Sequence, residues 1–222
     1  MKTYSRIFGT GSYVPSKVLT NADLEKMVET SDDWIIDRTG IKQRHIRDEN
    51  DTTISMATEA GRKALEAAGI DKNKIGLIIV ATTFPDRLFP NTASAVQFNL
   101  DLTGTKCPAF DVSAACTGFI YALTLADMYI RDGKAEYALV VSSESITRVV
   151  DWNDRNLCIF FGDGAVAVVL GPSDKPGIYS THLHLDSKSP DLLYLSGDMY
   201  SKNTPPCYIQ MRGNEVFKIA VT

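Results

Sequence analysis

Leu77-Ile78-Ile79-Val80-Ala81 is the stretch that indicates the architecture of this chain. Its apolar residues are rich in β-branched side chains and lack the polar alternation of a half-exposed strand. Such a run is typical of a strand buried on both faces, as in parallel sheets covered by helices. A helix is predicted before it, because Ile54 to Ala68 is amphipathic, with Thr53 as a cap and Gly69 as a stop. Together they predict a βαβ unit and a parallel sheet.

The same succession of helical and strand-like patterns extends along most of the chain. Apolar runs predict further strands at residues 4–9, 108–112, 137–142, 165–170 and 178–185. Capping residues and helical spacing predict further helices at residues 20–29, 33–38, 91–100 and 117–131. The segment from Gly171 to Gly177 is rich in turn residues and is the candidate boundary between two halves. We therefore expect an α/β protein.

Charge and hydropathy exclude several classes of protein. The 222-residue chain is 44% hydrophobic with a formal net charge of −4, and its Lys and Arg residues are dispersed among acids, so nucleic acid is not an expected partner. No apolar run approaches the ~18 residues of a membrane span, and residues 1–7 lack the apolar core of a signal peptide. We expect a cytoplasmic protein without a membrane partner, whose four cysteines are reduced.

Cys116 is the candidate nucleophile. It lies in Asp111-Val-Ser-Ala-Ala-Cys-Thr-Gly-Phe119, between a predicted strand and a predicted helix. Free N–H groups and partial positive charge at the first turn of a helix stabilise a thiolate. A lone cysteine on an apolar segment is more often buried and inert. Ala114, Ala115 and Gly118 favour the nucleophile, because small residues leave room for a sharp turn and for a substrate.

Five motifs together resemble the β-ketoacyl-acyl carrier protein synthase III family. They are Gly9-Thr-Gly-Ser-Tyr-Val-Pro15, Trp34-Ile-Ile-Asp-Arg-Thr-Gly-Ile41, Asp111-Val-Ser-Ala-Ala-Cys-Thr-Gly-Phe119, Phe161-Gly-Asp-Gly-Ala165 and Gly213-Asn-Glu-Val-Phe217. The resemblance runs in order along essentially the whole chain. It implies a thiolase-like α/β fold, layered α-β-α-β-α, with two halves related by a pseudo-dyad. Residues 1–172 are then the half that carries the nucleophile, and residues 173–222 begin an incomplete second half.

The resemblance also implies the reaction that opens type II fatty-acid synthesis. An acyl group passes from acyl-CoA to the cysteine, and condensation with malonyl-acyl carrier protein then releases CO₂ and gives a β-ketoacyl product. The expected partners are acetyl-CoA, malonyl-acyl carrier protein and a second copy of the chain in a homodimer. Coenzyme A enters as a thioester substrate, so no cofactor and no metal is expected.

The family takes the donors that stabilise the enolate from a His and an Asn in its second half. This chain has three histidines, and His45, His182 and His184 all match scaffold positions. His182 and His184 alternate on a predicted strand and so face one side, but no carboxylate or Cys stands at ligand spacing to complete a metal site.

The last residues, Phe217 to Thr222, have the pattern of a helix without a C-terminal cap. We therefore expect that the last third of the enzyme, with its His and Asn, is not in this chain. The chain is then a fragment, or a companion chain completes the fold. Alone, it is expected to be inactive.

Two sets of residues follow from the resemblance. Contacts to coenzyme A are expected from Thr30, Trp34, Arg38, Arg155, Asn156, Gly213 and Asn214. An indole and a guanidinium both stack on adenine, although Trp34 taken alone is as compatible with a core anchor, and a smaller residue is also common at Asn156. The acyl pocket is expected from Phe89, Ile146, Phe161, Leu193 and Phe217, with Phe89 contributed across a two-fold interface. A phenylalanine there implies a short cavity that prefers acetyl, since longer or branched primers would overpack it by ~1–3 kcal/mol.

Two alternatives remain open. One is another thiolase-fold acyltransferase, such as a hydroxymethylglutaryl-CoA synthase-like enzyme. Thiolase itself needs a second catalytic cysteine, and Cys158 and Cys207 lack its setting. The other alternative, from a different class, is a non-catalytic fragment, subunit or binding module that retains the fold.

Overall fold

The computed structural model describes residues 4–195 and 207–221. The chain forms two compact units. The first, here called the sheet unit, consists of Met1–Ser16, Arg47–Ser145 and Asp163–Leu183. The second unit consists of Lys17–Ile46, Ile146–Gly162 and His184–Thr222. The expected halves, residues 1–172 and 173–222, are related by a pseudo-dyad and are not the same as these two units. Their division stays a prediction.

The sheet unit is built on one five-stranded sheet, ordered β1-β7-β6-β4-β5. The strands are β1 (Tyr4–Tyr13), β4 (Ile75–Ala81), β5 (Ala109–Val112), β6 (Tyr137–Glu144) and β7 (Gly164–Ser173). β4 pairs in parallel with both β5 and β6, as predicted, whereas β7 is antiparallel to β6 and β1. The expectation of a parallel sheet was therefore wrong for β7. An apolar run shows burial but not strand direction, and this strand is buried like its neighbours.

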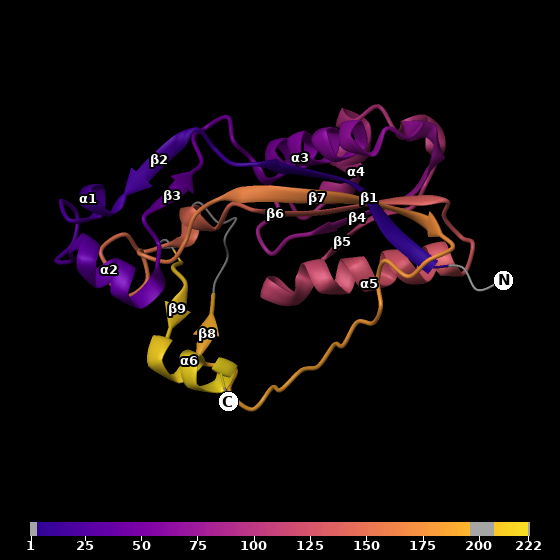
Figure 1. Ribbon diagram of the computed structural model, residues 1–222. Coiled ribbons are helices and arrows are strands. Elements are labelled where there is room, and N and C mark those ends of the chain that lie inside the picture. Colours follow the sequence, from indigo (N-terminus) through magenta and orange to yellow (C-terminus); the bar gives the residue numbers. More distant parts are fainter. Residues whose placement is uncertain (1–3, 196–206, 222) are drawn as a thin grey trace. The chain divides into compact units, whose positions relative to one another are not determined.

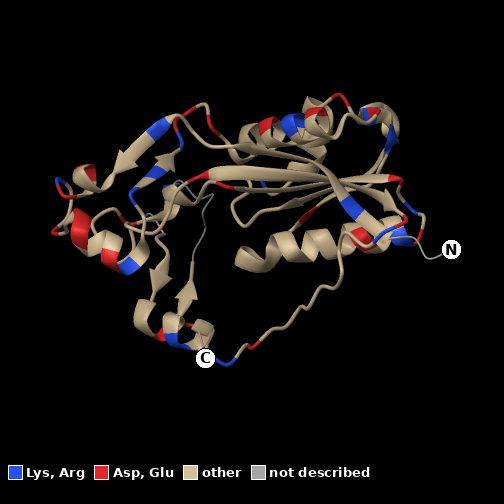
Figure 2. Ribbon diagram, viewed as in Figure 1, with Lys and Arg blue, Asp and Glu red and all other residues tan. Residues whose placement is uncertain are grey.

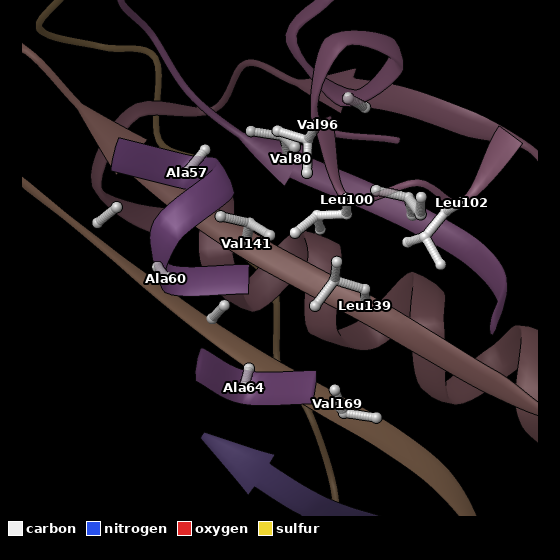
Figure 3. Close-up of a cluster of buried hydrophobic side chains, with 14 of the residues drawn as sticks. Ala57, Ala60, Ala64, Val80, Val96, Leu100, Leu102, Leu139, Val141 and Val169 are labelled. Atoms are coloured by element: carbon white, nitrogen blue, oxygen red, sulfur yellow. The ribbon is translucent and has the colours of Figure 1, made fainter. Parts of the chain in front are cut away.

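Helices cover both faces of this sheet. α3 (Thr53–Ala68) and α4 (Thr92–Asn99) lie on one face, and α5 (Gly118–Arg131) lies on the other (Figure 1). Successive residues of β4 point to opposite faces, so Ile78 and Val80 pack with α3 and α4. Leu77 and Ile79 pack with α5. Figure 3 shows the first of these cores, in which small residues of α3 meet valines of β4, β6 and β7. The prediction of a strand buried on both faces is confirmed.

Two glycines let α3 lie directly on β1. A Cβ at Gly9 would overlap the backbone of Ala64 and Ala68, and one at Gly11 would overlap the backbone of Ala60 and Ala64. No side chain fits between the strand and the helix at these points, so the glycines set how closely the two elements approach.

The predicted helix ends in the sheet unit agree with the structure to within a residue. The N-cap of α3 is Thr52, whose hydroxyl accepts the Ser55 N–H, and not the expected Thr53. Thr53 instead points inward, where its hydroxyl donates to the Phe84 carbonyl at 2.6 Å. Gly69 ends the helix in the left-handed region, at φ 61°. Short 3-10 turns occupy Lys72–Lys74, Thr103–Thr105 and Ala115–Thr117.

The second unit contains smaller elements. β2 (Lys17–Thr20) pairs antiparallel with β3 (Gln43–Ile46), and β8 (Leu193–Tyr194) pairs antiparallel with β9 (Gln210–Met211). Its helical elements are α1 (Asn21–Leu24), α2 (Asp32–Thr39), the 3-10 turn Ile146–Val149 and α6 (Gly213–Val221). The predicted helix at 20–29 is wrong beyond its first turn. After Leu24 the N–H groups of Lys26 and Met27 donate to carbonyls three residues back, and one bond of the α-helical type follows, from the Val28 N–H to the Leu24 carbonyl.

The predicted strand at 178–185 is also wrong. Gly177 and Ile178 both donate their N–H groups to the carbonyl of Ser5, and the chain then continues without regular secondary structure. Among the described residues no strand pairs with this segment. A polar and apolar alternation requires a neighbouring ladder to become a strand, and none is supplied here.

Charge is distributed unevenly over the helices of the sheet unit. α3 carries residues of both signs, whereas α5 carries none from Gly118 to Ala126 (Figure 2). Ile120 and Met128 of α5 are exposed. No described helix is both long enough and apolar enough to cross a membrane.

Candidate functional site

The carboxyl ends of β4, β5 and β6 meet at one edge of the sheet. Ala81 lies beside Val112 on one side and beside Ser142 on the other. The pairing of β4 with β5 continues one residue past the end of β4, because the Thr82 N–H donates to the Val112 carbonyl at 3.1 Å. Three segments therefore leave the sheet at this edge, and the one after β5 carries Cys116.

Cys116 lies in the middle of the 3-10 turn that joins β5 to α5. The turn begins with Ala115 in the left-handed region, at φ 44°, which is uncommon for a residue with a Cβ. Thr117 closes it, because its N–H and its hydroxyl both reach the Ala114 carbonyl. A Cβ at Gly118 would lie 3.3 Å from the Cβ of Ala81, so the start of α5 approaches β4 closely. The predicted sharp strand-to-helix turn with small residues is confirmed.

The cysteines differ in access. Of the four, Cys116 is the exposed one, Cys107 and Cys207 are half-buried, and Cys158 is buried. Burial raises the pKa of the Cys158 thiol, and the nearby Asp154 carboxylate raises it further. A raised pKa makes a thiol a poorer nucleophile at neutral pH. Cys116 is therefore the cysteine best placed to meet a large substrate.

Two guanidinium groups lie close to the ring of Trp34 in the second unit. Arg38, one helical turn along α2, stands 4.2 Å from the centre of its ring, and Arg155 stands 5.0 Å from it. Arg155 also donates to the Glu29 carbonyl at 2.8 Å. The indole is partly exposed, and its neighbour Ile35 is the fully buried residue of α2. The structure thus brings three of the expected coenzyme A residues together, and it argues against a core anchor at Trp34.

The other expected coenzyme A residues lie in the same unit. The hydroxyl of Thr30 is buried and makes no hydrogen bond with another described residue. Asn156 is exposed. Gly213 and Asn214 are exposed at the start of α6.

The expected pocket residues are divided between the units. Phe89 belongs to the sheet unit and is 83% exposed, in the loop that follows β4. The others belong to the second unit: Ile146 and Phe161 are half-buried, and Leu193 and Phe217 are exposed. Phe161 packs edge-on against Phe160, with ring centres 6.4 Å apart.

Glu144, at the end of β6, was not expected at this edge. One carboxylate oxygen accepts the Thr83 N–H at 2.9 Å, and the other accepts it at 3.2 Å. Burial raises the pKa of Glu144 to about 7, although hydrogen bonds from the backbone of Thr83 and Phe84 act in the opposite direction. A carboxylate directly after an apolar strand was the available sequence signal.

The histidines lie away from any cluster of ligands. His45 is on β3, and His182 and His184 are both exposed on the segment after β7. In the described part of the chain, no group of three or more His, Cys, Asp or Glu residues is arranged to hold a metal ion.

Comparison with known proteins places this arrangement in a family. The profile of 3-oxoacyl-[acyl-carrier-protein] synthase III matches residues 110–187, which include Cys116 and the turn around it. The β-ketoacyl-[acyl-carrier-protein] synthase III of Thiobacillus denitrificans is 52% identical over 219 residues, which are 99% of this chain and 68% of that protein. The corresponding synthase of Salmonella arizonae is 54% identical over the same share of both.

A solved structure agrees with these relatives. The 3-oxoacyl-[acyl-carrier-protein] synthase III of Aquifex aeolicus is 45% identical and superposes with a TM-score of 0.86, over 97% of this chain and 67% of that one. The predicted α/β fold of the thiolase-like type is confirmed, and the hydroxymethylglutaryl-CoA synthase-like alternative is not supported. This chain belongs to the β-ketoacyl-[acyl-carrier-protein] synthase III family of condensing acyltransferases.

Proposed function

We propose that Cys116 is the acyl carrier of this condensing enzyme and that acetyl-CoA supplies the acyl group. The Cys116 thiolate attacks the thioester carbonyl, the coenzyme A thiolate leaves, and an acetyl-cysteine thioester forms. Malonyl-acyl carrier protein then loses CO₂, and its enolate attacks the acetyl carbonyl while the cysteine thiolate leaves. The observation that carries this proposal is the exposed Cys116 at the turn between β5 and α5 in a chain of this family.

The turn around Cys116 suits this chemistry. Backbone N–H groups at the start of a helix are fixed donors, and they favour the negative charge that develops on a thioester oxygen. α5 starts two residues after Cys116. A small residue at Gly118 keeps the helix start close to β4, so these donors are held by the sheet.

The condensation step needs donors for the enolate, which the family takes from a His and an Asn. The chain spans 68% of the length of the curated relatives described above. We propose that both residues come from outside residues 1–222, either from the same polypeptide or from a companion chain, that the assembly is a homodimer, and that it acts in the cytoplasm. Intact masses of every polypeptide in the purified protein distinguish the two sources. A sample that condenses with residues 1–222 as its sole polypeptide would contradict both.

The cluster of Trp34, Arg38 and Arg155 is the proposed adenine site of coenzyme A. A flat indole beside two guanidiniums offers stacking surfaces and positive charge to a nucleotide that carries phosphates. We assign Thr30, whose buried hydroxyl makes no hydrogen bond with another described residue, to a polar edge of the base. We assign Asn156 to the same region, and Gly213 and Asn214 to the pantetheine arm.

Replacing Trp34 with alanine is expected to weaken coenzyme A binding by about 1–3 kcal/mol, the usual contribution of an aromatic platform to base stacking. Isothermal titration of the purified protein measures it. Tyr179→Ala removes an aromatic side chain that is 87% exposed in the other unit, and it should leave the affinity unchanged. Equal affinities for wild type and Trp34→Ala, with an intact fold, would remove Trp34 from the site.

The proposed acyl pocket predicts the primer. We assign its lining to Ile146, Phe161, Leu193 and Phe217 of one protomer and Phe89 of the other, which gives a short apolar cavity. Condensation with malonyl-acyl carrier protein should therefore be faster with acetyl-CoA than with isobutyryl-CoA, by about tenfold or more, since overpacking costs ~1–3 kcal/mol. Product formation from the two thioesters, compared as kcat/KM, decides it. A preference for isobutyryl-CoA would overturn the acetyl assignment.

A further inference from the structure

The segment after β4 is held at its start by three polar side chains. Glu144 accepts the Thr83 N–H on both carboxylate oxygens. The Thr53 hydroxyl donates to the Phe84 carbonyl at 2.6 Å. Asp86 accepts the N–H groups of Thr53 and Ile54 at 3.2 and 2.8 Å, and so ties the same segment to the start of α3.

The segment is held again where it enters α4. Asn91 caps that helix by accepting the Ser94 N–H at 2.9 Å, and its amide donates to the Ala109 carbonyl of β5. Asp111 of β5 accepts the N–H groups of Thr92 and Ala93, both at 2.8 Å. Between the two anchored ends, Leu88 and Phe89 are 71% and 83% exposed. The loop is therefore held at both ends, and Phe89 lies exposed between them.

Among the side chains that hold the start of this segment, Glu144 is the one whose burial disfavours its charged form. Its side chain is half-buried, and burial raises its pKa from 4.5 to about 7. Between these pH values the folded state holds more protons than the unfolded state, so ionised Glu144 lowers stability as the pH rises through this range. An uncharged side chain would avoid this cost. The contacts of Glu144 are with the backbone of the segment after β4, so its direct effect is to hold that segment in place.

We propose that Glu144 is a positioning residue of the condensation reaction, which fixes the loop at residues 85–90 and thereby the place of Phe89 in the primer pocket. This inference rests on the assignment of Phe89 to that pocket. The carboxylate accepts the Thr83 N–H on two oxygens and so orients the segment that leads to Phe89. A glutamine at residue 144 would present one acceptor oxygen and one donor NH₂ group. The NH₂ group cannot hydrogen-bond to the Thr83 N–H, because both are donors.

The test compares Glu144→Gln with Glu136→Gln, Phe89→Ala and wild type. Glu136 precedes the other end of β6 and forms an exposed ion pair with Lys74, so its replacement is a matched control. The readout is the ratio of kcat/KM for acetyl-CoA to kcat/KM for butyryl-CoA, with thermal unfolding measured in parallel. A general loss of structure lowers both rate constants together, whereas a misplaced pocket wall changes their ratio.

Glu144→Gln and Phe89→Ala are each expected to lower this ratio by about tenfold, and Glu136→Gln should leave it unchanged. Glu144→Asp, whose shorter carboxylate keeps two acceptor oxygens, should restore part of the ratio. If Phe89→Ala lowers the ratio and Glu144→Gln does not, the role of Glu144 is overturned and the pocket assignment stands. If Phe89→Ala leaves the ratio unchanged, the pocket assignment is wrong and this inference falls with it.

Discussion

Replacing Cys116 with serine is expected to reduce condensation by about 10⁴-fold or more, the order of loss seen when a covalent nucleophile is removed. A serine hydroxyl at this turn is a far weaker nucleophile than a thiolate, and no base is placed to activate it in the proposed mechanism. Because Cys116 is exposed in a turn and not part of the core, the fold should not change. The measurement is kcat with acetyl-CoA and malonyl-acyl carrier protein.

Cys207→Ser is the matched control for this change. Cys207 is a half-buried thiol in the second unit and has no role in the proposed chemistry. Its replacement should leave kcat within about twofold of wild type, as expected for a substitution away from the reacting atoms. Full activity in Cys116→Ser would show that the acyl group is carried elsewhere.

Replacing Gly11 with alanine is expected to destabilise the sheet unit by about 3 kcal/mol or more, because the new methyl group would overlap the backbone of α3 at Ala60 and Ala64. A neighbour that is backbone cannot rotate away, so the helix and β1 must separate. For a chain of this size the midpoint of thermal unfolding should fall by about 10 °C. Calorimetry of the purified protein measures this shift.

Gly104→Ala tests whether the effect of Gly11→Ala comes from the contact itself. A Cβ at Gly104 would meet nothing within 4 Å, so its midpoint should stay within about 2 °C of wild type. Equal midpoints for Gly11→Ala and Gly104→Ala would mean that β1 and α3 do not approach as closely as described.

Much of the sheet unit could be predicted because its signals are local. The β-branched run at Leu77–Ala81 shows burial on both faces, and caps such as Gly69 mark where a helix ends. The direction of β7 could not be predicted in this way. That strand follows a long excursion into the second unit, and its return against β6 depends on tertiary structure that the apolar run at Ala165–Leu170 does not encode.

The prediction of a strand at residues 178–185 was wrong for a related reason. Its alternating residues fit a strand, but a strand also requires a partner, and pairing is a property of the whole fold. The β2 and β3 pair was missed because both strands are only four residues long and lack a clear pattern.

The candidate site likewise has features that the sequence could predict and features that it could not. The turn at Cys116 was predictable from small residues between a strand and a helix. The approach of Arg155 to Trp34 was expected only from the family resemblance, since no local signal joins residues so far apart in sequence. Glu144 was missed because its burial and its contact with Thr83 arise only when β4 and β6 lie side by side.

The central claim is that Cys116 carries the acyl group, and the site of acetylation tests it most directly. The purified protein, with every chain that it contains, is incubated with acetyl-CoA alone, digested, and analysed by mass spectrometry. One acetyl group is expected, on the peptide that contains Cys116, and it should be lost when malonyl-acyl carrier protein is added. An acetyl group on Cys107, Cys158 or Cys207 in place of Cys116 would contradict the account.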